Sequence, residues 1–349
     1  MNTEIIKIQP GDGPVSEEDD AKLKAAGEIL RRGGLVAFPT ETVYGLGGDA
    51  LNPTSSKRIY AAKGRPSDNP LIVHIYRFED IYKITGDVPE EARRIADAFW
   101  PGPLTMILPK REIVPYRTTG GLETVGVRCP NHPVTLAVIA AADVPIAAPS
   151  GNTSGRPSPT SAADMLEDMD GKIDGIFDGG PCGVGVESTI IDLTCQPPRL
   201  LRAGGLPLEE LERVLGTVLV DKCITQLMTD GERPRAPGMK YRHYAPKAPV
   251  TVVTGDGKKS AAYIAAHAPE GAGVICFSEF RAQFPGCVVH ELGPEGDKSE
   301  QARRVFDALR EFDATDVTEI FAQCPDDAGL GLAIGNRLKK AAGFHVVEV

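Results

Sequence analysis

The chain has 349 residues, of which 42% are hydrophobic and 25% charged, and its formal net charge is -10. This length exceeds the size at which a single hydrophobic core usually stops growing, so we expect two domains. The negative charge argues against a protein that coats nucleic acid and against attraction to an anionic membrane surface, so a polyanionic ligand must meet a local basic patch.

Helices and strands alternate along the first part of the chain. A helix that begins near Ser16 leads to the apolar run 35–38, which we expect to be a buried strand because Pro39 has no N–H for the strand ladder. Further strands are expected at 71–75, 104–108, 124–128, 145–148, 175–177, 188–193 and 199–201, and helices at 55–62, 90–100, 131–142, 162–169 and 208–215. This alternation predicts an α/β fold with a substantial twisted sheet.

The periodicity disappears after about residue 223, where cations collect among prolines and tyrosines. The residues concerned are Arg233, Arg235, Lys240, Tyr241, Arg242, Tyr244 and Lys247. We interpret residues 217–249 as a basic linker, whose charge is the reverse of the whole chain's. It can be a soluble tether, but tyrosines and prolines among the cations favour a folded flap.

Residues 250–349 alternate again and predict a second, smaller domain. Strands are expected near 250–253, 274–277, 288–292, 319–322 and 345–349, with helices notably at 300–312 and 330–342. We expect a Rossmann-like α/β domain with a structural role. No dinucleotide is expected, because no Gly-x-Gly-x-x-Gly opens a helix after its first strand.

The seven cysteines are scattered, and no pair has Cys-x-x-Cys spacing. Residues 1–14 lack the basic-then-apolar pattern of a signal peptide, and no apolar run is as long as a membrane span. We therefore expect a cytoplasmic protein with reduced thiols. Cys129 and His132 lie close in sequence, but two residues with no second pair do not make a metal site, so we expect no resident metal.

Polar residues cluster where strands end and where glycine and proline mark loops. The clusters are Thr40/Glu41/Thr42, Lys63/Arg65/Asn69 with His74, Thr124/Arg128, Ser150 with Ser158, Glu187/Ser188/Thr189 and Arg202. Strand ends bring distant segments together, so these clusters can line one cavity. They are rich in cations and hydroxyls but lack paired carboxylates or a nucleophile with its base, which favours an anionic substrate such as a nucleoside triphosphate over covalent catalysis.

Each cluster also has a simpler interpretation. Thr40 and Thr42 can be turn residues or helix caps. Lys63 and Arg65 can be the solvated C-terminus of a helix, where the macrodipole favours cations. His74 can be a core histidine with satisfied hydrogen bonds.

The clusters belong to longer motifs that stand in the order found in one family. The motifs are Pro39–Gly47, Lys63–Leu71, Trp100–Thr105, Val127–Pro130, Ala148–Asn152, Glu187–Ile190, Leu201–Gly204 and Pro237–Pro246. They resemble the YrdC-like threonylcarbamoyl-AMP synthases in the two-domain form with an additional C-terminal domain. The motifs cover the first domain and the linker, whereas the C-terminal domain is similar by position and strand–helix pattern.

The resemblance implies an α/β catalytic domain of residues 1–216, which contains a YrdC-like twisted open mixed sheet with helices. The basic linker 217–249 joins it to a smaller Rossmann-like α/β domain of residues 250–349. It also implies that L-threonine, bicarbonate and ATP, with Mg²⁺, give threonylcarbamoyl-adenylate and pyrophosphate. A downstream threonylcarbamoyl transferase complex then modifies the adenosine beside the anticodon of certain tRNAs. A weak contact with tRNA is a further expectation.

The resemblance also implies roles for single residues. The expected L-threonine set is Thr42, His74, Arg128 and Ser188. The expected ATP set is Lys63, Arg65, Asn69, Thr124, Ala148 through its backbone, Ser150, Ser158, Arg202 and Tyr244. Lys63 and Arg65 are expected to be catalytic by positioning and charge neutralisation, and Glu41 to be a structural acceptor or an indirect metal partner.

We predict that residues 233–246 fold over the cavity, bring Tyr244 to the triphosphate and exclude water from a labile adenylate. Two other classes compete with this interpretation. One is a tRNA or double-stranded RNA binding protein that uses the same basic cavity, against which the net charge of -10 counts. The other is a carbamoyl-transfer enzyme of hydrogenase maturation, which would need zinc-finger and acylphosphatase-like segments that this sequence lacks.

Overall fold

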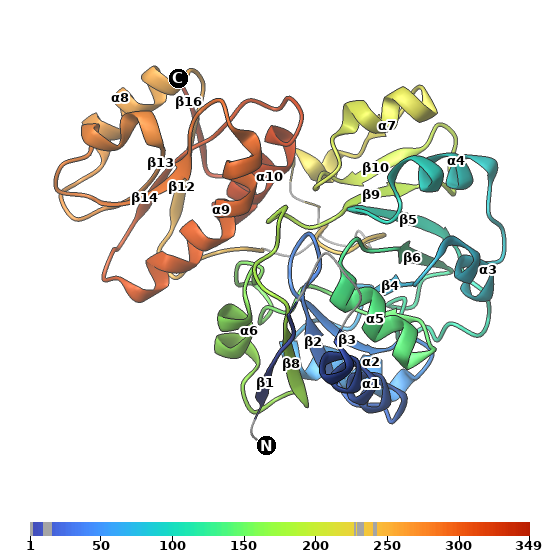
Figure 1. Ribbon diagram of the computed structural model, residues 1–349. Coiled ribbons are helices and arrows are strands. Elements are labelled where there is room, and N and C mark those ends of the chain that lie inside the picture. Colours follow the sequence, from blue (N-terminus) through green and yellow to red (C-terminus); the bar gives the residue numbers. More distant parts are fainter. Residues whose placement is uncertain (1–2, 10–15, 227, 229–233, 240–242) are drawn as a thin grey trace.

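The computed structural model describes residues 3–9, 16–226, 228, 234–239 and 243–349, which form two lobes, each built on its own β-sheet (Figure 1). The N-terminal end lies at the edge of the larger lobe and the C-terminal end in the smaller one. Nine residues of the expected basic linker, 227, 229–233 and 240–242, lie outside the described residues, and among them are Arg233, Lys240, Tyr241 and Arg242.

The larger lobe contains a sheet of eleven strands within the described part of the chain. Its strands are β1 Glu4–Lys7, β2 Val36–Phe38, β3 Gly45–Asp49, β4 Ile72–His74, β5 Leu104–Pro109, β6 Thr124–Arg128, β7 Ile146–Ala147, β8 Gly175–Asp178, β9 Thr189–Asp192, β10 Arg199–Arg202 and β11 Leu219–Val220. Its helices are α1 Glu17–Arg31, α2 Pro53–Lys63, α3 Ile81–Ile84, α4 Glu90–Phe99, α5 Pro133–Ala142, α6 Ala162–Met169 and α7 Leu208–Leu215.

The strands of this sheet lie in the order β1-β8-β2-β3-β7-β4-β6-β5-β9-β10-β11. Parallel pairs, such as β4 with β6, are mixed with antiparallel pairs, such as β5 with β6. The expected mixed sheet is therefore confirmed. Strand β11 pairs with β10 and so extends the sheet into the segment that the sequence assigns to the linker.

Helix α2 shows how local sequence positions two basic side chains. Asn52 caps its N-terminus, and Pro53 occupies the first turn, where its missing N–H leaves no bond unmade. The helix ends at Gly64, which has a φ of 61° that glycine adopts without strain. Lys63 is therefore the last helical residue, and Arg65 begins the following loop.

Strand β3 is an element that the sequence does not predict, because three of its five residues are glycine. It pairs with β2 in antiparallel register. A Cβ atom added to Gly47 would lie only 2.4 Å from the ring of Phe38. Because glycine has no side chain, the strand can pack this closely against Phe38. The same glycines prevent the strand from being predicted from the sequence.

The smaller lobe contains five strands, all paired in parallel. They are β12 Val250–Thr254, β13 Gly273–Phe277, β14 Val288–Gly293, β15 Ile320–Gln323 and β16 Val346–Glu348, with helices α8 Gly257–His267, α9 Lys298–Glu311 and α10 Gly331–Ala341. The order is β14-β13-β15-β12-β16. The expected α/β layering is confirmed, although this order differs from that of dinucleotide-binding domains.

The two lobes meet through helices α9 and α10, which pack together on the face of the smaller lobe that is nearer the larger one (Figure 1). Residues outside the smaller lobe join its buried apolar core; they are Val43, Val186, Ala203, Tyr244 and Ala248. The interface is thus packed like a domain interior.

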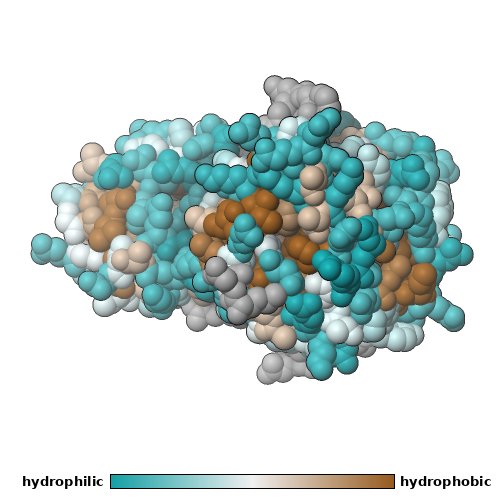
Figure 2. All heavy atoms as spheres, turned by 60° about the horizontal axis from the view of Figure 1, so that its bottom comes forward, coloured by the Kyte–Doolittle hydropathy of each residue, from teal (hydrophilic) through white to brown (hydrophobic). Residues whose placement is uncertain are grey.

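The exterior is mostly hydrophilic on the face seen in Figure 2, where apolar side chains gather in separate patches. Within the described ranges, no helix has both the length and the apolar character needed to cross a bilayer.

Candidate functional site

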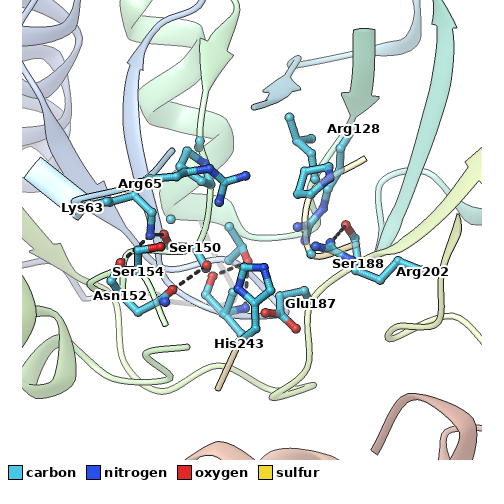
Figure 3. Close-up of a pocket in the computed structure, with 18 of the residues that line it drawn as sticks. Lys63, Arg65, Arg128, Ser150, Asn152, Ser154, Glu187, Ser188, Arg202 and His243 are labelled. Atoms are coloured by element: carbon cyan, nitrogen blue, oxygen red, sulfur yellow. Dashed lines mark hydrogen bonds between the residues drawn. The ribbon is translucent and has the colours of Figure 1, made fainter. Parts of the chain in front are cut away.

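A cavity lies between the strand ends of the larger lobe and the described end of the linker (Figure 3). It encloses about 670 Å³ of empty space, its solvent-open part included. It is lined by Thr40, Val43, Gly45, Lys63, Arg65, Ile72, His74, Arg128, Ala148, Pro149, Ser150, Asn152, Ser154, Glu187, Ser188, Arg202, Pro237, Gly238, His243 and Tyr244.

Nine of the expected site residues line this cavity. They are Lys63, Arg65, His74, Arg128, Ala148, Ser150, Ser188, Arg202 and Tyr244. Topology explains part of this convergence. His74 and Arg128 are the last residues of the adjacent parallel strands β4 and β6 and lie opposite each other in register, and the carboxyl ends of parallel strands form a common edge.

Four expected residues do not line the cavity. Thr42 is fully buried, and its Oγ1 lies 2.8 Å from Oγ1 of Thr40, which lines the cavity instead. Thr124 is the first residue of β6, at the end opposite Arg128. Asn69 is buried, and its side-chain amide has no hydrogen-bond partner among the described residues.

The fourth, Ser158, is buried one step behind the cavity wall. Its Oγ donates a hydrogen bond of 2.7 Å to Oε1 of Glu187, which does line the cavity. Ser158 therefore contacts the site through that carboxylate.

Lys63 is buried, with 1% of its surface exposed, so it is not a solvated helix end. Its ammonium group donates to the backbone oxygens of Ser150, at 2.5 Å, and of Asn152. Burial, and then the positive charge of Arg65, lower the pKa of Lys63 well below its ordinary value. The Arg65 guanidinium donates to the backbone of Pro70 at 2.9 Å. An anion placed between these two cations would relieve the charge repulsion.

Arg128 reaches the cavity from the side opposite Lys63 and Arg65 (Figure 3). Its Nη2 lies 2.7 Å from Oε1 of Glu41 in an ion pair whose side chains are 5% and 13% exposed. The contact is an ion pair without hydrogen-bond geometry, since neither oxygen of Glu41 has a hydrogen-bond partner among the described residues. His74 is 2% exposed, and burial, followed by the charge of Arg128, lowers the pKa of His74 to about 3, so the ring is neutral at physiological pH.

Arg202 and Ser188 form one wall of the cavity, where the end of β10 meets the start of β9. Arg202 donates to the backbone oxygen of Ser188 at 3.0 Å and to its hydroxyl at 3.1 Å. The same hydroxyl lies 2.8 Å from Oγ1 of Thr105. Burial lowers the pKa of Arg202 to about 10, which leaves the guanidinium positively charged.

The linker supplies the remaining wall through Pro237, Gly238, His243 and Tyr244. Tyr244 has a φ of 65°, an uncommon conformation for a residue with a side chain. Its aromatic ring lies 5.0 Å from the ring of Phe306 in α9. Burial, and then the charge of Lys340, lower the pKa of His243 to about 3, so this imidazole is neutral too.

Among the described residues, the lining therefore holds four cationic side chains and one carboxylate, that of Glu187. Among residues 3–9, 16–226, 228, 234–239 and 243–349, no group of three or more histidine, cysteine, aspartate or glutamate side chains could hold a metal ion. Its four cationic side chains suit the site to an anionic ligand.

Several lining residues carry no role in the sequence-based prediction. They are Thr40, Asn152, Ser154, Glu187, Pro237, Gly238 and His243. All except Ser154 fall within the motifs that carry the resemblance, so the signal is present at those positions. What the sequence lacks is the direction in which each side chain points.

Comparison with known proteins agrees with this arrangement. Residues 28–204 match the family model described as "Telomere recombination", and residues 206–343 match the model described as "Threonylcarbamoyl-AMP synthase, C-terminal domain". The chain is 49% identical over 338 residues to the threonylcarbamoyl-AMP synthase of Pyrococcus abyssi, which covers 95% of this chain and 97% of that relative. It is 46% identical over 333 residues to the threonylcarbamoyl-AMP synthase of Bacillus subtilis, with 95% of each chain covered.

The fold agrees with that of a solved relative as well. The crystal structure of Pyrococcus abyssi Sua5 complexed with L-threonine superimposes with a TM-score of 0.91 at 47% identity, covering 99% of this chain and 100% of that one. Similarity therefore extends over both lobes.

Proposed function

The chain belongs to the threonylcarbamoyl-AMP synthase family, in the form with the additional C-terminal domain, and on this premise we propose that it converts L-threonine, bicarbonate and ATP into threonylcarbamoyl-adenylate and pyrophosphate. The observation that carries the proposal is the convergence of four cationic side chains from distant segments, with serine hydroxyls between them, on one cavity. The Pyrococcus abyssi relative was crystallised with L-threonine, which supports the amino-acid half of the site.

We assign the threonine carboxylate to Arg128. Glu41 forms an ion pair with this guanidinium. Nε and Nη2 of Arg128 have no hydrogen-bond partner among the described residues and can donate to a ligand. The neutral His74 and the hydroxyl of Ser188 lie on the same side of the cavity and suit the polar remainder of the amino acid. Thr42 acts, on this proposal, through its contact with Thr40.

We assign the triphosphate to the basic side formed by Lys63 and Arg65, together with Arg202. The other proposed ATP contacts that line the cavity are the backbone of Ala148, Ser150 and Tyr244. Asn69, Thr124 and Ser158 do not line it and belong to the proposed ATP set on the family resemblance. The unpartnered amide of Asn69 supports its inclusion, because a buried amide without a partner is costly unless a ligand satisfies it. Lys63 and Arg65 are the proposed catalytic pair.

The chemistry that these residues would support needs no protein nucleophile. Bicarbonate takes up a proton and loses water to give carbon dioxide. The amine of threonine adds to this carbon dioxide and loses a proton to solvent, which gives a carbamate. A carbamate oxygen attacks the α-phosphorus of ATP, and the bond from that phosphorus to the bridging oxygen breaks, so pyrophosphate leaves with the electron pair. Lys63, Arg65 and Arg202 would stabilise the charge that develops on the phosphoryl oxygens.

Magnesium would enter as part of the substrate, bound to phosphate oxygens and water in its usual manner. The carboxylate of Glu187 already accepts hydrogen bonds on both oxygens, from Ser158 and from Arg337 of α10. The proposal therefore assigns no protein ligand to the ion.

The linker, on this proposal, closes the cavity over the adenylate. The backbone N–H of Ala245 donates to the oxygen of Gly155 at 2.9 Å, which ties the linker to the loop that carries Ser158. Excluding water matters because the mixed anhydride hydrolyses readily. The product would pass to a threonylcarbamoyl transferase complex that acts on tRNA, and a weak contact with tRNA remains part of the proposal. A cytoplasmic location fits the seven free cysteines.

Pyrophosphate release from MgATP tests the proposal. We expect release to require both L-threonine and bicarbonate, with reactions that omit one of them as controls. Release that depends on neither would refute the assignment. Tight RNA binding without turnover would favour the RNA-binding class instead.

A further inference from the structure

Helix α10 of the smaller lobe buries three polar side chains. Asn336, Arg337 and Lys340 are 3%, 0% and 7% exposed. Burying an arginine and a lysine costs free energy unless each finds a partner. Nη1 of Arg337 donates to Oδ1 of Asn336 within the helix. The other partners lie outside the smaller lobe, in the larger lobe and in the linker.

Arg337 reaches the wall of the candidate site. Its Nε donates to Oε2 of Glu187 at 2.7 Å, while the other carboxylate oxygen accepts from Ser158 at 2.7 Å. The guanidinium carbon also lies 5.5 Å from the centre of the Tyr244 ring, within the range of a cation–π contact. One side chain of α10 thus contacts two residues that line the cavity.

The neighbouring polar residues hold the linker. Asn336 donates from its amide to the backbone oxygen of Ile224 at 2.7 Å, and Lys340 donates to the backbone oxygen of Gly238. Gly238 itself lines the cavity. Helix α10 therefore forms hydrogen bonds with the linker at two points and with the cavity wall at a third.

We propose that Arg337 is a positioning residue for the ATP side of the site, through which the smaller lobe orients Glu187, Ser158 and Tyr244. The inference rests on the proposed function. It adds to the site a residue from the smaller lobe, for which the sequence predicts only a structural role. Arg337 supplies a planar guanidinium that can bond the carboxylate while stacking on the tyrosine ring. It fixes one oxygen of Glu187, so that the other oxygen holds Ser158 in one rotamer.

A purely structural role makes a different prediction. If Arg337 only joins the lobes, its loss would lower the melting temperature and affect use of both substrates alike. If it positions Ser158 and Tyr244, its loss would raise KM for ATP much more than KM for L-threonine. Glu187 bonds Ser158 on the ATP side, whereas Ser188, its neighbour in the chain, is held separately by Arg202 and Thr105.

The test uses the full-length protein and the pyrophosphate assay with Arg337→Met and Arg337→Lys. Wild-type turnover is measured first, because its absence would refute the proposed function rather than this inference. Lys339→Met is the matched control. It removes a positive charge from the same helix, where Lys339 faces Asp327 at 3.6 Å.

Losing a hydrogen bond to a charged group weakens an equilibrium constant, such as that for binding, by about tenfold or more. We therefore expect Arg337→Met to raise KM for ATP by about tenfold, with KM for L-threonine changed less than about twofold. Arg337→Lys should recover part of the loss, and Lys339→Met should behave like wild type.

Wild-type kinetics in Arg337→Met, or equal increases in both KM values, would overturn the inference. Should Arg337→Met fail to fold, Glu187→Gln in the Arg337→Lys background provides the second measurement. Because the two residues act as one unit, the double variant should raise KM for ATP no more than the stronger single variant. Multiplicative increases would overturn the inference.

Discussion

Replacing Glu187 by glutamine tests the buried ion pair between the lobes through the pH dependence of stability. Burial alone would raise the pKa of the Glu187 carboxyl, but Arg337 and then Arg202 outweigh burial and lower the pKa from 4.5 to about 2. The unfolded chain then binds more protons than the folded one in this range, so the free energy of unfolding rises with pH. The ionised carboxylate of Glu187 therefore stabilises the folded protein by about 3 kcal/mol above about pH 5. This contribution to the free energy of unfolding is lost as the pH falls toward 2.

Urea unfolding of wild type and of Glu187→Gln, followed by circular dichroism, measures this stabilisation. The variant leaves Arg337 without its anionic partner, so it should be less stable at about pH 6. The difference in the free energy of unfolding should shrink by about 2 kcal/mol between about pH 6 and about pH 3. Glu348→Gln, which removes an exposed carboxylate in β16, is the matched control and should follow wild type at every pH. A difference that stays constant with pH would refute the reasoning.

Further predictions concern the cations, the lobe interface and the linker. Arg65→Ala should lower kcat/KM for ATP on the order of 100-fold, since it removes a preorganised charge, and unchanged turnover would remove Arg65 from the site. Gly185→Ala should lower the melting temperature, because the added Cβ would lie 2.4 Å from the backbone of Ala302 in α9 and the φ of 83° suits glycine. Thermal melting checks this. An unchanged melting temperature would argue against close packing of the lobes at this point. Truncation after Gln226, which keeps β11 in the larger sheet, should abolish adenylate formation while circular dichroism reports a folded larger lobe. Full activity of that fragment would contradict the role assigned to the linker.

Much of the larger sheet is readable from the sequence because its strands are buried on both faces. Residues 35–38 form a short apolar run and residues 104–108 are mostly apolar, and strands β2 and β5 lie there in the structure. Continuous apolar runs of this length are typical of the interior of such a sheet. The glycine-rich β3 escapes the same criterion, because its fit depends on the ring of Phe38 in the neighbouring strand.

The cavity is predictable only in part. His74 and Arg128 end strands, and strand ends are where ligand-contacting groups collect, so sequence reasoning finds them. The choice between Thr40 and Thr42 is different, since both follow the same strand and only the fold decides which of them faces the cavity.

Arg337 could not be found from the sequence. It lies 150 residues after its partner Glu187. The sequence of its helix does not distinguish a buried arginine from one exposed to solvent. The side chain becomes part of the cavity wall only because α10 packs against the larger lobe. Its contribution is a property of the tertiary structure.

The most direct test of the central claim is to follow the carbon of bicarbonate. The full-length protein is incubated with MgATP, L-threonine and ¹³C-bicarbonate, and the adenylate is analysed by mass spectrometry as soon as it forms. The account predicts a threonylcarbamoyl-adenylate that carries the label in its carbamoyl group, formed in proportion to pyrophosphate. An adenylate without the label, or pyrophosphate released without any such adenylate, would contradict it.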